Sequence, residues 1–321
     1  MSDRRFDLVI AGELNPDAIV RVDTFEVRRG QVESLVDGGV LTIGSSGAIV
    51  ACGAARLGMR VAYVGVVGND ASGRLMLDEL RRREVDVEGC RVDPRHATGL
   101  SVVLSNGDDR ATLTSLGAMA SLTATDVGDD LLADTRHLHV SSPHLQSGLR
   151  DGLAELFARA HGAGASTSLD PGWDPDGAWG AGLEDALVQT DVFLPNAAEA
   201  CAFAGVDDPE AALELLAERI DTVAIKLGSE GAIARHGEQT LKADAPAVES
   251  VDGTGAGDSF TAGYLRAQIH EESLDRALRL GIACGSLSTR RLGGVDAQPR
   301  LDEAVETAER ISVREISRSG T

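Results

Sequence analysis

A chain of 321 residues can form two modest domains or one large one, and 43% hydrophobic with 25% charged residues indicates a folded protein. Its 51 acidic and 30 basic residues give a formal charge of -21, which repels nucleic acid and anionic lipid surfaces and argues against both as partners. Aromatic residues make up only 3% of the chain, which argues against a stacking platform for single-stranded nucleic acid.

The cysteines and the amino-terminal segment bear on the cellular compartment. The cysteines are far apart and form no Cys-x-x-Cys pair, which predicts free thiols rather than a zinc site or a disulfide framework. They are Cys52, Cys90, Cys201 and Cys284. The opening run MSDRRFDLVIAG enters a glycine turn too early for a signal peptide, and no apolar stretch approaches membrane-spanning length. We therefore expect a cytoplasmic protein without membrane contact.

Short β-branched or apolar runs alternate with helical patterns along the chain. The runs predicted as strands are FDLVIAG from Phe6, VAYVGVVG from Val61, HLHVSS from His137, DVFLPN from Asp191 and TVAIKLG from Thr222. The predicted helices cover residues 46–57, 145–162, 196–204 and 208–219. Strands joined through helices of this length predict an α/β fold, in which helices cover both faces of a mostly parallel sheet. Ligands of such folds bind at the carboxyl ends of the strands.

Two segments, at about 13–43 and 98–116, interrupt the alternation. The second reads GLSVVLSNGDDRATLTSL from Gly99, which predicts a hairpin that turns at residues 106–109. We expect these segments to form a small sheet that projects as a lid over the ligand, with an ordinary edge hairpin as the alternative. The sequence contains no repeat or linker, so residues 1–321 are expected to form a single domain. Pairing through the exposed lid strands would give a homodimer.

The most informative stretch is SVDGTGAGDSF, residues 250–260, which precedes the amphipathic run TAGYLRAQIH. A glycine-dense turn that opens a helix directs backbone N–H groups to one spot, where the helix dipole favours an anion. The amides of Gly255, Ala256 and Gly257 would form an anion hole for a phosphoryl group, and Asp258 would accept a proton from an attacking hydroxyl. Alternatively, Asp258 only complements the helix dipole and the glycines only shape the turn.

DGTGAGDSF resembles the carboxyl-terminal signature of the ribokinase-like (PfkB) family of sugar kinases, Asp-Thr-x-Gly-Ala-Gly-Asp-x-Phe, and departs from it at Gly253. Other segments match that family in the same order over nearly the whole chain: GELNPDAIVRVD, RLGMRVAYVGVVGNDASG (with Asn69 in place of an aspartate), PNAAEA and KLGSEGA. The resemblance implies a three-layer α/β/α fold. It also implies an ATP-dependent carbohydrate kinase that transfers the γ-phosphoryl group of Mg-ATP to a hydroxyl of a small sugar or sugar derivative.

The resemblance also implies roles for individual residues. The residues matched to ATP contacts are Asn196, Lys226, Gly228, Gly231 and Thr254. Asp17 matches a carboxylate that binds sugar hydroxyls. Glu199, in the Asn-x-x-Glu motif, would organise Mg²⁺ through water, although Asn196 and Glu199 could equally form a helix capping box. Asp252 matches the region that holds K⁺ in family members.

The family's amino-terminal signature is altered in this chain. It normally holds two glycines and, after three residues, an asparagine that binds sugar hydroxyls; here Gly44, Ser45 and Ile49 occupy those three positions. Isoleucine can neither donate nor accept a hydrogen bond, so the acceptor is not expected to bind as ribose commonly does. We expect Gly44 and Ser45 to line the acceptor site, with His144 and Trp173 completing it. Alternatively, Trp173 packs under a loop and His144 caps a helix.

Three other functions are compatible with parts of the pattern. A nucleoside kinase would share every donor-side motif and differ only under the lid. A catalytically silent, sugar-sensing binding protein would keep the fold but lose turnover, and the complete Gly-Ala-Gly-Asp run argues against it. A dinucleotide-dependent oxidoreductase is disfavoured because the first strand is not followed by Gly-x-Gly-x-x-Gly. The lid segments contain no basic cluster, which favours an uncharged acceptor over a phosphorylated one.

Overall fold

The computed structural model describes residues 4–316, apart from residues 27–28, 107–108 and 181. Within these residues the main sheet has nine strands. In spatial order they are β15 (Val313–Glu315), β14 (Gln239–Ala243), β13 (Ala232–His236), β12 (Thr222–Lys226), β11 (Val192–Phe193), β10 (Ser166–Asp170), β9 (Thr135–Ser141), β1 (Phe6–Ala11) and β4 (Val61–Val64). The six strands from β12 to β4 pair in parallel, and the other three continue the sheet antiparallel.

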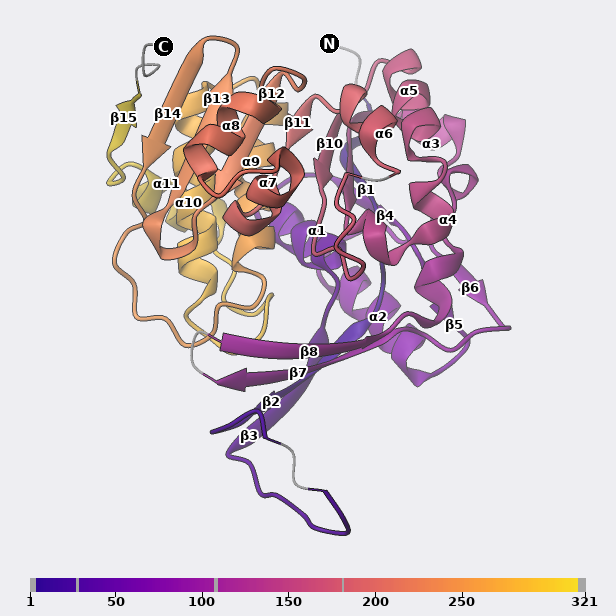
Figure 1. The fold of residues 1–321 in the computed structure, drawn as a ribbon. Helices are drawn as coiled ribbons and strands as arrows, with labels where there is room; N and C mark the ends of the chain where they lie inside the picture. Colours follow the sequence, from indigo (N-terminus) through magenta and orange to yellow (C-terminus); the bar gives the residue numbers. More distant parts are fainter. Residues whose placement is uncertain (1–3, 27–28, 107–108, 181, 317–321) are drawn as a thin grey trace.

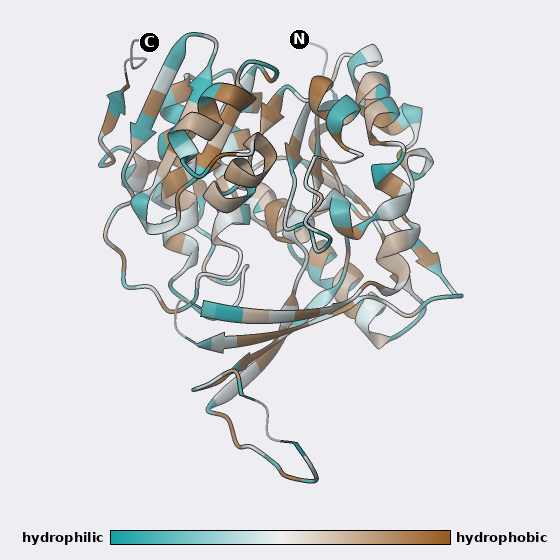
Figure 2. Cartoon of the chain, in the orientation of Figure 1, coloured by the Kyte–Doolittle hydropathy of each residue, from teal (hydrophilic) through white to brown (hydrophobic). Residues whose placement is uncertain are grey.

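Helices cover both faces of this sheet (Figure 1). One face packs against α1 (Ser46–Arg56), α2 (Ala71–Arg82), α9 (Ala256–Ile269), α10 (Leu274–Ser288) and α11 (Leu301–Ala308). The other packs against α3 (Asp129–Ala133), α5 (Leu153–Gly162), α6 (Glu184–Val188), α7 (Ala197–Ala204) and α8 (Pro209–Leu216). On β1, Leu8 and Ile10 enter the first core while Val9 and Ala11 enter the second, because successive side chains of a strand alternate between faces. Figure 2 accordingly shows brown, hydrophobic residues along the central strands.

A separate sheet of four strands projects from this body (Figure 1). Its order is β3 (Gly38–Ile43), β2 (Pro16–Arg21), β7 (Leu100–Asn106) and β8 (Asp109–Ser115). The strands come from the two segments predicted to form a lid. Asn106 pairs with Asp109, as the predicted hairpin requires, and turn residues 107–108 lie outside the described residues. The predicted fold class, a mostly parallel central sheet with a small separate sheet, is confirmed. A further short pair joins β5 (Val66–Gly68) to β6 (Arg91–Asp93).

Three predicted elements differ from the structure. The run VAYVGVVG, predicted as one strand, is divided at Gly65 into β4 of the main sheet and β5 of the short pair. The helix predicted at 145–162 is divided into a 3₁₀ turn at Pro143–Leu145, α4 (Ser147–Arg150) and α5. The division falls at Gly152, whose backbone lies so close to Ala124 that an added Cβ would come within 2.7 Å of the Ala124 Cβ. The strand predicted from DVFLPN shortens to Val192–Phe193, because Pro195 has no N–H for a ladder and Asn196 begins α7.

Strands β9 and β10 carry a polar row through the interior. The His137 imidazole lies 2.6 Å from the Ser166 hydroxyl and 2.7 Å from the Ser168 hydroxyl, which in turn lies 2.8 Å from His139 Nδ1. Burial lowers the pKa of both histidines to about 3, so both are neutral at physiological pH. Hydrogen bonding therefore lets polar side chains occupy a central sheet position, and the row ends near the carboxyl edge of the sheet, where Asp170 lies.

Candidate active site

The start of α9 lies at the centre of the site. Gly255, the residue before the helix, has a φ of 72°, a left-handed conformation that glycine adopts without strain. Asp258 in the first turn accepts a hydrogen bond from the Ser46 hydroxyl over 2.5 Å. Ser46 is the first residue of α1, so the amino-terminal ends of two helices meet at this carboxylate. Burial, followed by the charge of Asp170, raises the pKa of Asp258 to about 6, which suits a base that works near neutral pH.

The three amides predicted to form an anion hole are not equivalent. The Ala256 N–H donates to the Gly253 carbonyl over 3.2 Å. No acceptor among the described residues takes the N–H of Gly255 or of Gly257, as expected for the first turn of a helix. The amides of Gly255 and Gly257 are therefore the ones available to an incoming anion.

Lys226 lies beside this turn, at the carboxyl end of β12. Its ammonium forms an ion pair of 2.6 Å with Asp170 at the end of β10. The ammonium also lies next to Gly257, at van der Waals distance from the position that a Cβ there would occupy. Burial alone would lower the pKa of Lys226, but the charges of Asp170, Glu199 and Asp258 outweigh it and raise the pKa. One partly buried lysine thus interacts with three carboxylates at the carboxyl edge of the sheet.

Asn196 and Glu199 form the capping box that was the structural alternative for these residues. Asn196 Oδ1 accepts the Glu199 N–H over 2.9 Å, and Glu199 Oε2 accepts the Asn196 N–H over 2.8 Å. A bridge between Asn196 and Lys226 joins this helix start to the end of β12. Burial, followed by the charge of Asp170, raises the pKa of Glu199 to about 7. The cap therefore holds a buried carboxyl group beside Lys226.

A second group of predicted residues surrounds Asp17 on the lid strand β2. A side chain at Gly44 would overlap the Asp17 carboxylate, so glycine is required there. Ser45 has a φ of 68° and directs its hydroxyl to Asn15, which donates a weak hydrogen bond of 3.4 Å to Asp17. Burial, followed by the charge of Asp258, raises the pKa of Asp17 to about 6. The lid carboxylate and the carboxylate of α9 therefore influence each other across the site.

Ile49, the isoleucine at the family's asparagine position, packs under the glycine turn. A Cβ on Gly294 would lie 2.7 Å from Ile49 Cδ1, and one on Gly255 would lie 3.1 Å from Ile49 Cγ2. Ile49 is only 3% exposed. The side chain thus supports the turn by apolar contact, and hydrogen bonds to the acceptor must come from other residues.

The remaining nucleotide-side residues shape loops. Asp252 Oδ1 accepts the N–H and the hydroxyl of Thr254, and its Oδ2 accepts the Gly293 N–H over 2.8 Å. This buried carboxylate therefore fixes the approach to the glycine turn. Gly228 and Gly231 have φ values of 62° and 94° and bound the short 3₁₀ turn that follows β12.

His144 and Trp173 lie together, in an aromatic group that also includes Trp179 and Phe203. The His144 ring centroid is 6.3 Å from that of Trp179, which is 5.0 Å from that of Trp173. His144 Nδ1 lies 3.8 Å from Asp174 Oδ1, and Trp173 is 64% exposed. Among the described residues, no hydrogen bond or ring contact joins this group to Asp17 or Asp258. A role of His144 and Trp173 in binding the acceptor therefore stays a prediction.

Glu13 is a buried carboxyl group that the sequence did not point to. It follows β1, and its Oε1 accepts the Ser46 N–H over 2.8 Å. Its Oε2 lies 3.4 Å from Gln146 Nε2. Because the Ser45 side chain is turned toward Asn15, Glu13 takes over the capping of α1 and holds Ser46 in place against Asp258. Burial raises the pKa of Glu13 to about 8, so this group is neutral at pH 7.

The raised pKa of Glu13 predicts that the folded chain becomes less stable as the pH rises. In the unfolded chain Glu13 ionises near pH 4.5, whereas in the folded chain it keeps its proton up to about pH 8. Folding therefore becomes less favourable between these values, and Glu199, Asp17 and Asp258 act in the same direction. Relative to the parent chain, Glu13→Gln should be more stable at pH 8 than at pH 5 by about 1 kcal/mol or more, since one pKa unit corresponds to about 1.4 kcal/mol.

Urea unfolding at pH 5, 6.5 and 8 measures this difference. Glu218→Gln, at an exposed position after α8, is the matched control and should show no such pH dependence. A Glu13→Gln variant whose stability difference from the parent chain stays constant from pH 5 to pH 8 would contradict the assignment of a raised pKa to Glu13.

Asp170, Ser46, Asn15 and Glu13 are the site residues that sequence reasoning missed. One signal was available: an acidic or amide residue directly after a strand lies at the ligand-binding edge of a parallel sheet, and this applies to Asp170 and, within a few residues, to Glu13 and Asn15. Ser46 carried no such signal, because its role depends on the packing of α1 against α9.

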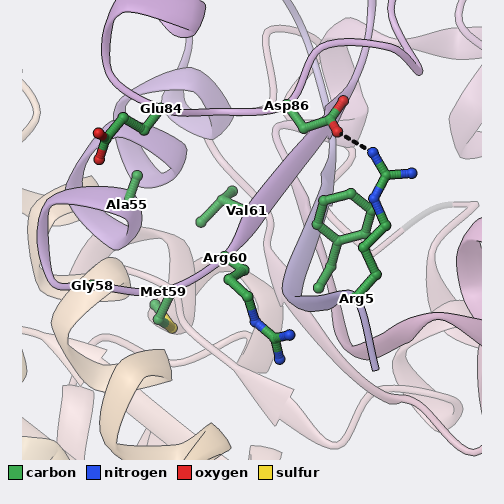
Figure 3. Close-up of a pocket in the computed structure, with 9 residues that line it drawn as sticks. Arg5, Ala55, Gly58, Met59, Arg60, Val61, Glu84 and Asp86 are labelled. Carbon is green, nitrogen blue, oxygen red and sulfur yellow. Dashed lines mark hydrogen bonds and ion pairs between the residues drawn. The ribbon is translucent and has the colours of Figure 1, made fainter. Parts of the chain in front are cut away.

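A cavity in the described part of the chain lies away from this site. It has a volume of about 450 Å³ and is lined by residues at the amino ends of β1 and β4, including Phe6 and Val61 (Figure 3). Its arginines are paired, Arg5 with Asp86 and Arg60 with Asp7. Because β1 and β4 run parallel, this cavity is at the edge of the sheet opposite to Asp258. It offers no catalytic group to the site.

The described residues contain neither a preformed metal centre nor a helix that could span a membrane. No group of three or more His, Cys, Asp or Glu side chains is arranged to hold a metal ion by itself. No helix in the described part of the chain combines the length and apolar character needed to cross a lipid bilayer.

Comparison with known proteins gives a consistent match. The profile described as pfkB family carbohydrate kinase matches residues 5–301. The 2-dehydro-3-deoxygluconokinase of Bacillus subtilis (strain 168) is 32% identical over 263 residues, which cover 78% of this chain and 81% of that protein. The ATP-dependent ribose-1-phosphate kinase of Halopiger xanaduensis is 30% identical, covering 89% of this chain and 93% of that protein.

The solved structures include one with bound nucleotide. A putative ribokinase II from E. coli, in complex with ATP and Mg²⁺, superposes with a TM-score of 0.82 at 25% identity and covers 95% of this chain and 99% of that one.

Proposed function

Since this chain belongs to the pfkB family of carbohydrate kinases and is an ATP-dependent sugar kinase, we propose that Asp258 is its catalytic base. In the proposed reaction Asp258 takes the proton of an acceptor hydroxyl, whose oxygen then bonds to the γ-phosphorus of Mg-ATP. The bond from that phosphorus to the β–γ bridging oxygen breaks, and ADP leaves. The observation that carries the proposal is the start of α9, where a partly buried carboxylate adjoins two amides that have no acceptor among the described residues.

The amides of Gly255 and Gly257 are proposed to stabilise the negative charge on the transferring group, with Lys226 beside them. Lys226 is also proposed to contact the nucleotide, together with Asn196, Thr254 and the Gly228–Gly231 turn. Because its ammonium lies among these carboxylates, the anionic triphosphate chain would meet a positive charge as well as negative ones.

Mg²⁺ is proposed to arrive with ATP and to be held mainly by phosphate and water. The described residues fit this arrangement, because Glu199 already accepts the Asn196 N–H and has no metal-binding cluster around it. Glu199 would then act through water, as Mg²⁺ readily allows. A K⁺ site near Asp252 is a separate proposal. The Asp252 carboxylate, which also organises the loop, would bind the ion through its remaining lone pairs.

The acceptor is proposed to lie between Asp258 and the Asp17 group, with Gly44 and Ser45 at its edge. Asp17 would bind its hydroxyls, as charge-assisted hydrogen bonds to diols commonly do. His144 and Trp173 are proposed as contacts only for an acceptor that extends beyond this group. The relatives are named for different acceptors, so family membership does not select one.

A panel of pentoses, hexoses, polyols, sugar acids, sugar phosphates and nucleosides, assayed for ADP formation with Mg²⁺ and with or without K⁺, tests the proposal. Transfer to a sugar or sugar derivative supports it. Transfer only to nucleosides would favour the nucleoside kinase, and loss of transfer in every arm would favour a silent sugar-binding protein. Faster turnover with K⁺ than with Na⁺ would support the Asp252 site.

The outer face of the lid sheet is proposed to pair with a second copy of the chain. Strand alternation gives this face an apolar surface formed by Ala18, Val20, Leu41, Leu100, Val102, Leu104, Ala111 and Leu113. Leu41 and Leu113 are 55% and 68% exposed in the single chain. An apolar sheet face of this kind is typical of an interface rather than of a free surface. Free cysteines and use of ATP fit a cytoplasmic location for such a dimer.

Sedimentation velocity tests the pairing. The parent chain should sediment as a dimer at micromolar concentration, and Leu113→Glu should shift it to a monomer, because the substitution buries a charge in the interface. Val188→Glu, which replaces a similarly exposed apolar residue on α6, is the matched control and should leave the dimer intact. A monomeric parent chain would remove the proposal.

A further inference from the structure

The lid carries a cation that the nucleotide-side chemistry does not use. Arg110 lies on β8, and strand register places it on the same face as Thr112 and Thr114. Thr114 lies 3.0 Å from the Ser101 hydroxyl, which accepts a hydrogen bond from Asn15 beside Asp17. This face of β8 is therefore the inner face of the lid, directed to the acceptor side, and its residues are exposed.

Within the described part of the chain, the Arg110 guanidinium has no hydrogen-bond partner. Its backbone N–H donates to the Asp109 carboxylate over 2.8 Å. Among the described residues, no side chain forms an ion pair with its guanidinium, although the chain has an excess of acidic residues. Its charge nevertheless lowers the pKa of Asp17 and of Asp258, against the larger effect of burial on each. Strand register places Asp17 on this same face, in one row with Ser101 and Thr114, so Arg110 and Asp17 share the inner face of the lid.

Position and free bonding capacity together suggest a ligand. An exposed guanidinium has a planar set of N–H donors that matches the two oxygens of a carboxylate. Arg21 lies on the same face in the same transverse row, through Ser105, but on the inner strand β2 rather than on the edge strand β8. The charge of Arg110 acts on the pKa of Asp17 and of Asp258, and Arg21 is the comparison arginine of the row.

We propose that Arg110 binds a carboxylate of the acceptor, so that the enzyme selects a sugar acid over the corresponding neutral sugar alcohol. One guanidinium balances one negative charge, whereas a phosphate dianion beside Asp17 and Asp258 would need further cations that the inner face of the lid does not provide within the described residues. The inference rests on the proposed function and revises the expectation of an uncharged acceptor, because a single arginine is not visible as a basic cluster in the sequence.

Matched acceptor pairs test the selection. D-gluconate and D-glucitol differ at one carbon, which is a carboxylate in the first and a hydroxymethyl group in the second, and D-ribonate and ribitol form a second such pair. For at least one pair we expect kcat/KM for the acid to exceed that for the alcohol by about 10-fold or more, as charge-assisted hydrogen bonds suggest. Ribose 1-phosphate serves as the arm that distinguishes phosphate from carboxylate.

Arg110→Met should then lower kcat/KM for the acid by about 10- to 100-fold, mainly through KM, and change it for the alcohol by less than about threefold. Arg21→Met removes the other arginine of the row and should preserve the selection. Three results would overturn the proposal: higher kcat/KM for the alcohols, preference for ribose 1-phosphate over every sugar acid, or an equal loss of kcat for acid and alcohol in Arg110→Met. Absence of phosphorylation of any acceptor in the wider panel would instead count against the proposed function.

Discussion

Asp258→Asn is expected to lower turnover at least ~100-fold, the low end for loss of a general base, while leaving ATP affinity nearly unchanged. Asparagine keeps the shape of the side chain and its hydrogen bond from Ser46, but it cannot take a proton from the acceptor. Turnover is measured by ADP formation with the best acceptor of the panel, and ATP affinity by isothermal titration calorimetry.

Asp302→Asn is the matched control for the alternative that Asp258 only complements the helix dipole. Asp302 lies in the first turn of α11, as Asp258 does in α9, so both aspartates complement a helix dipole. If Asp258 served only the dipole, both substitutions would change stability slightly and neither would abolish turnover. Turnover of Asp258→Asn at the level of the parent chain would exclude Asp258 as the base.

The pH dependence of kcat/KM of the parent enzyme is a second test of Asp258. Because the pKa of Asp258 is raised to about 6, kcat/KM should fall as the pH drops below about 6 and the base becomes protonated. Asp17 titrates in the same range, so the measured pKa belongs to the pair. Ser46→Ala removes a hydrogen bond that lowers the pKa of Asp258. The fall of kcat/KM at low pH should therefore begin at a higher pH in this variant.

Lys226→Met is expected to cost about 3–5 kcal/mol of stability, because it leaves Asp170, Glu199 and Asp258 buried without a cation. It should also raise KM for ATP, since the amides of α9 would then face the phosphates beside uncompensated carboxylates. Urea unfolding measures the first effect and steady-state kinetics the second. Adding Asp170→Asn to Lys226→Met should restore part of the stability but not the activity, because it removes one of the unpaired charges.

Lys242→Met is the matched control, since Lys226 and Lys242 are the only lysines among the 30 basic residues. Lys242 pairs with Glu210 over 2.7 Å at a partly exposed position on β14. Such a pair contributes about 1 kcal/mol or less. If both substitutions had similarly small effects, Lys226 would not be the cation that balances the site.

The nucleotide-side elements were predictable because each depends on local sequence. The glycine turn before α9 needs Gly255 for its left-handed backbone, and the start of α7 needs Asn196 and Glu199 for its cap. Residues close in sequence form these features, so their spacing alone predicts the geometry. The lid strands were predictable for a similar reason, since alternation and a turn sequence lie within one segment.

The acceptor side could not be predicted in the same way. Ser46 contacts Asp258 across 212 positions of the chain, and Arg110 reaches the site only because β8 folds over it. Nothing in the sequence indicated that His144 and Trp173, both predicted beside the acceptor, would pack with Trp179 and Phe203. In the sequence, Ile49 indicated only the loss of a hydrogen-bonding asparagine. In the structure, its side chain packs under Gly255. Each of these contacts depends on how distant elements pack.

By itself the sequence determined the α/β class, the lid segments, the membership in a kinase family and the turn that opens α9. These properties follow from backbone preferences and side-chain periodicity, which act over a few neighbouring residues. Only the tertiary structure decided which carboxylates share Lys226, which residue hydrogen-bonds Asp258 and which face of the lid carries Arg110. Such contacts join the ends of strands far apart in the chain, and the protonation of the groups involved depends on burial that exists only in the folded core.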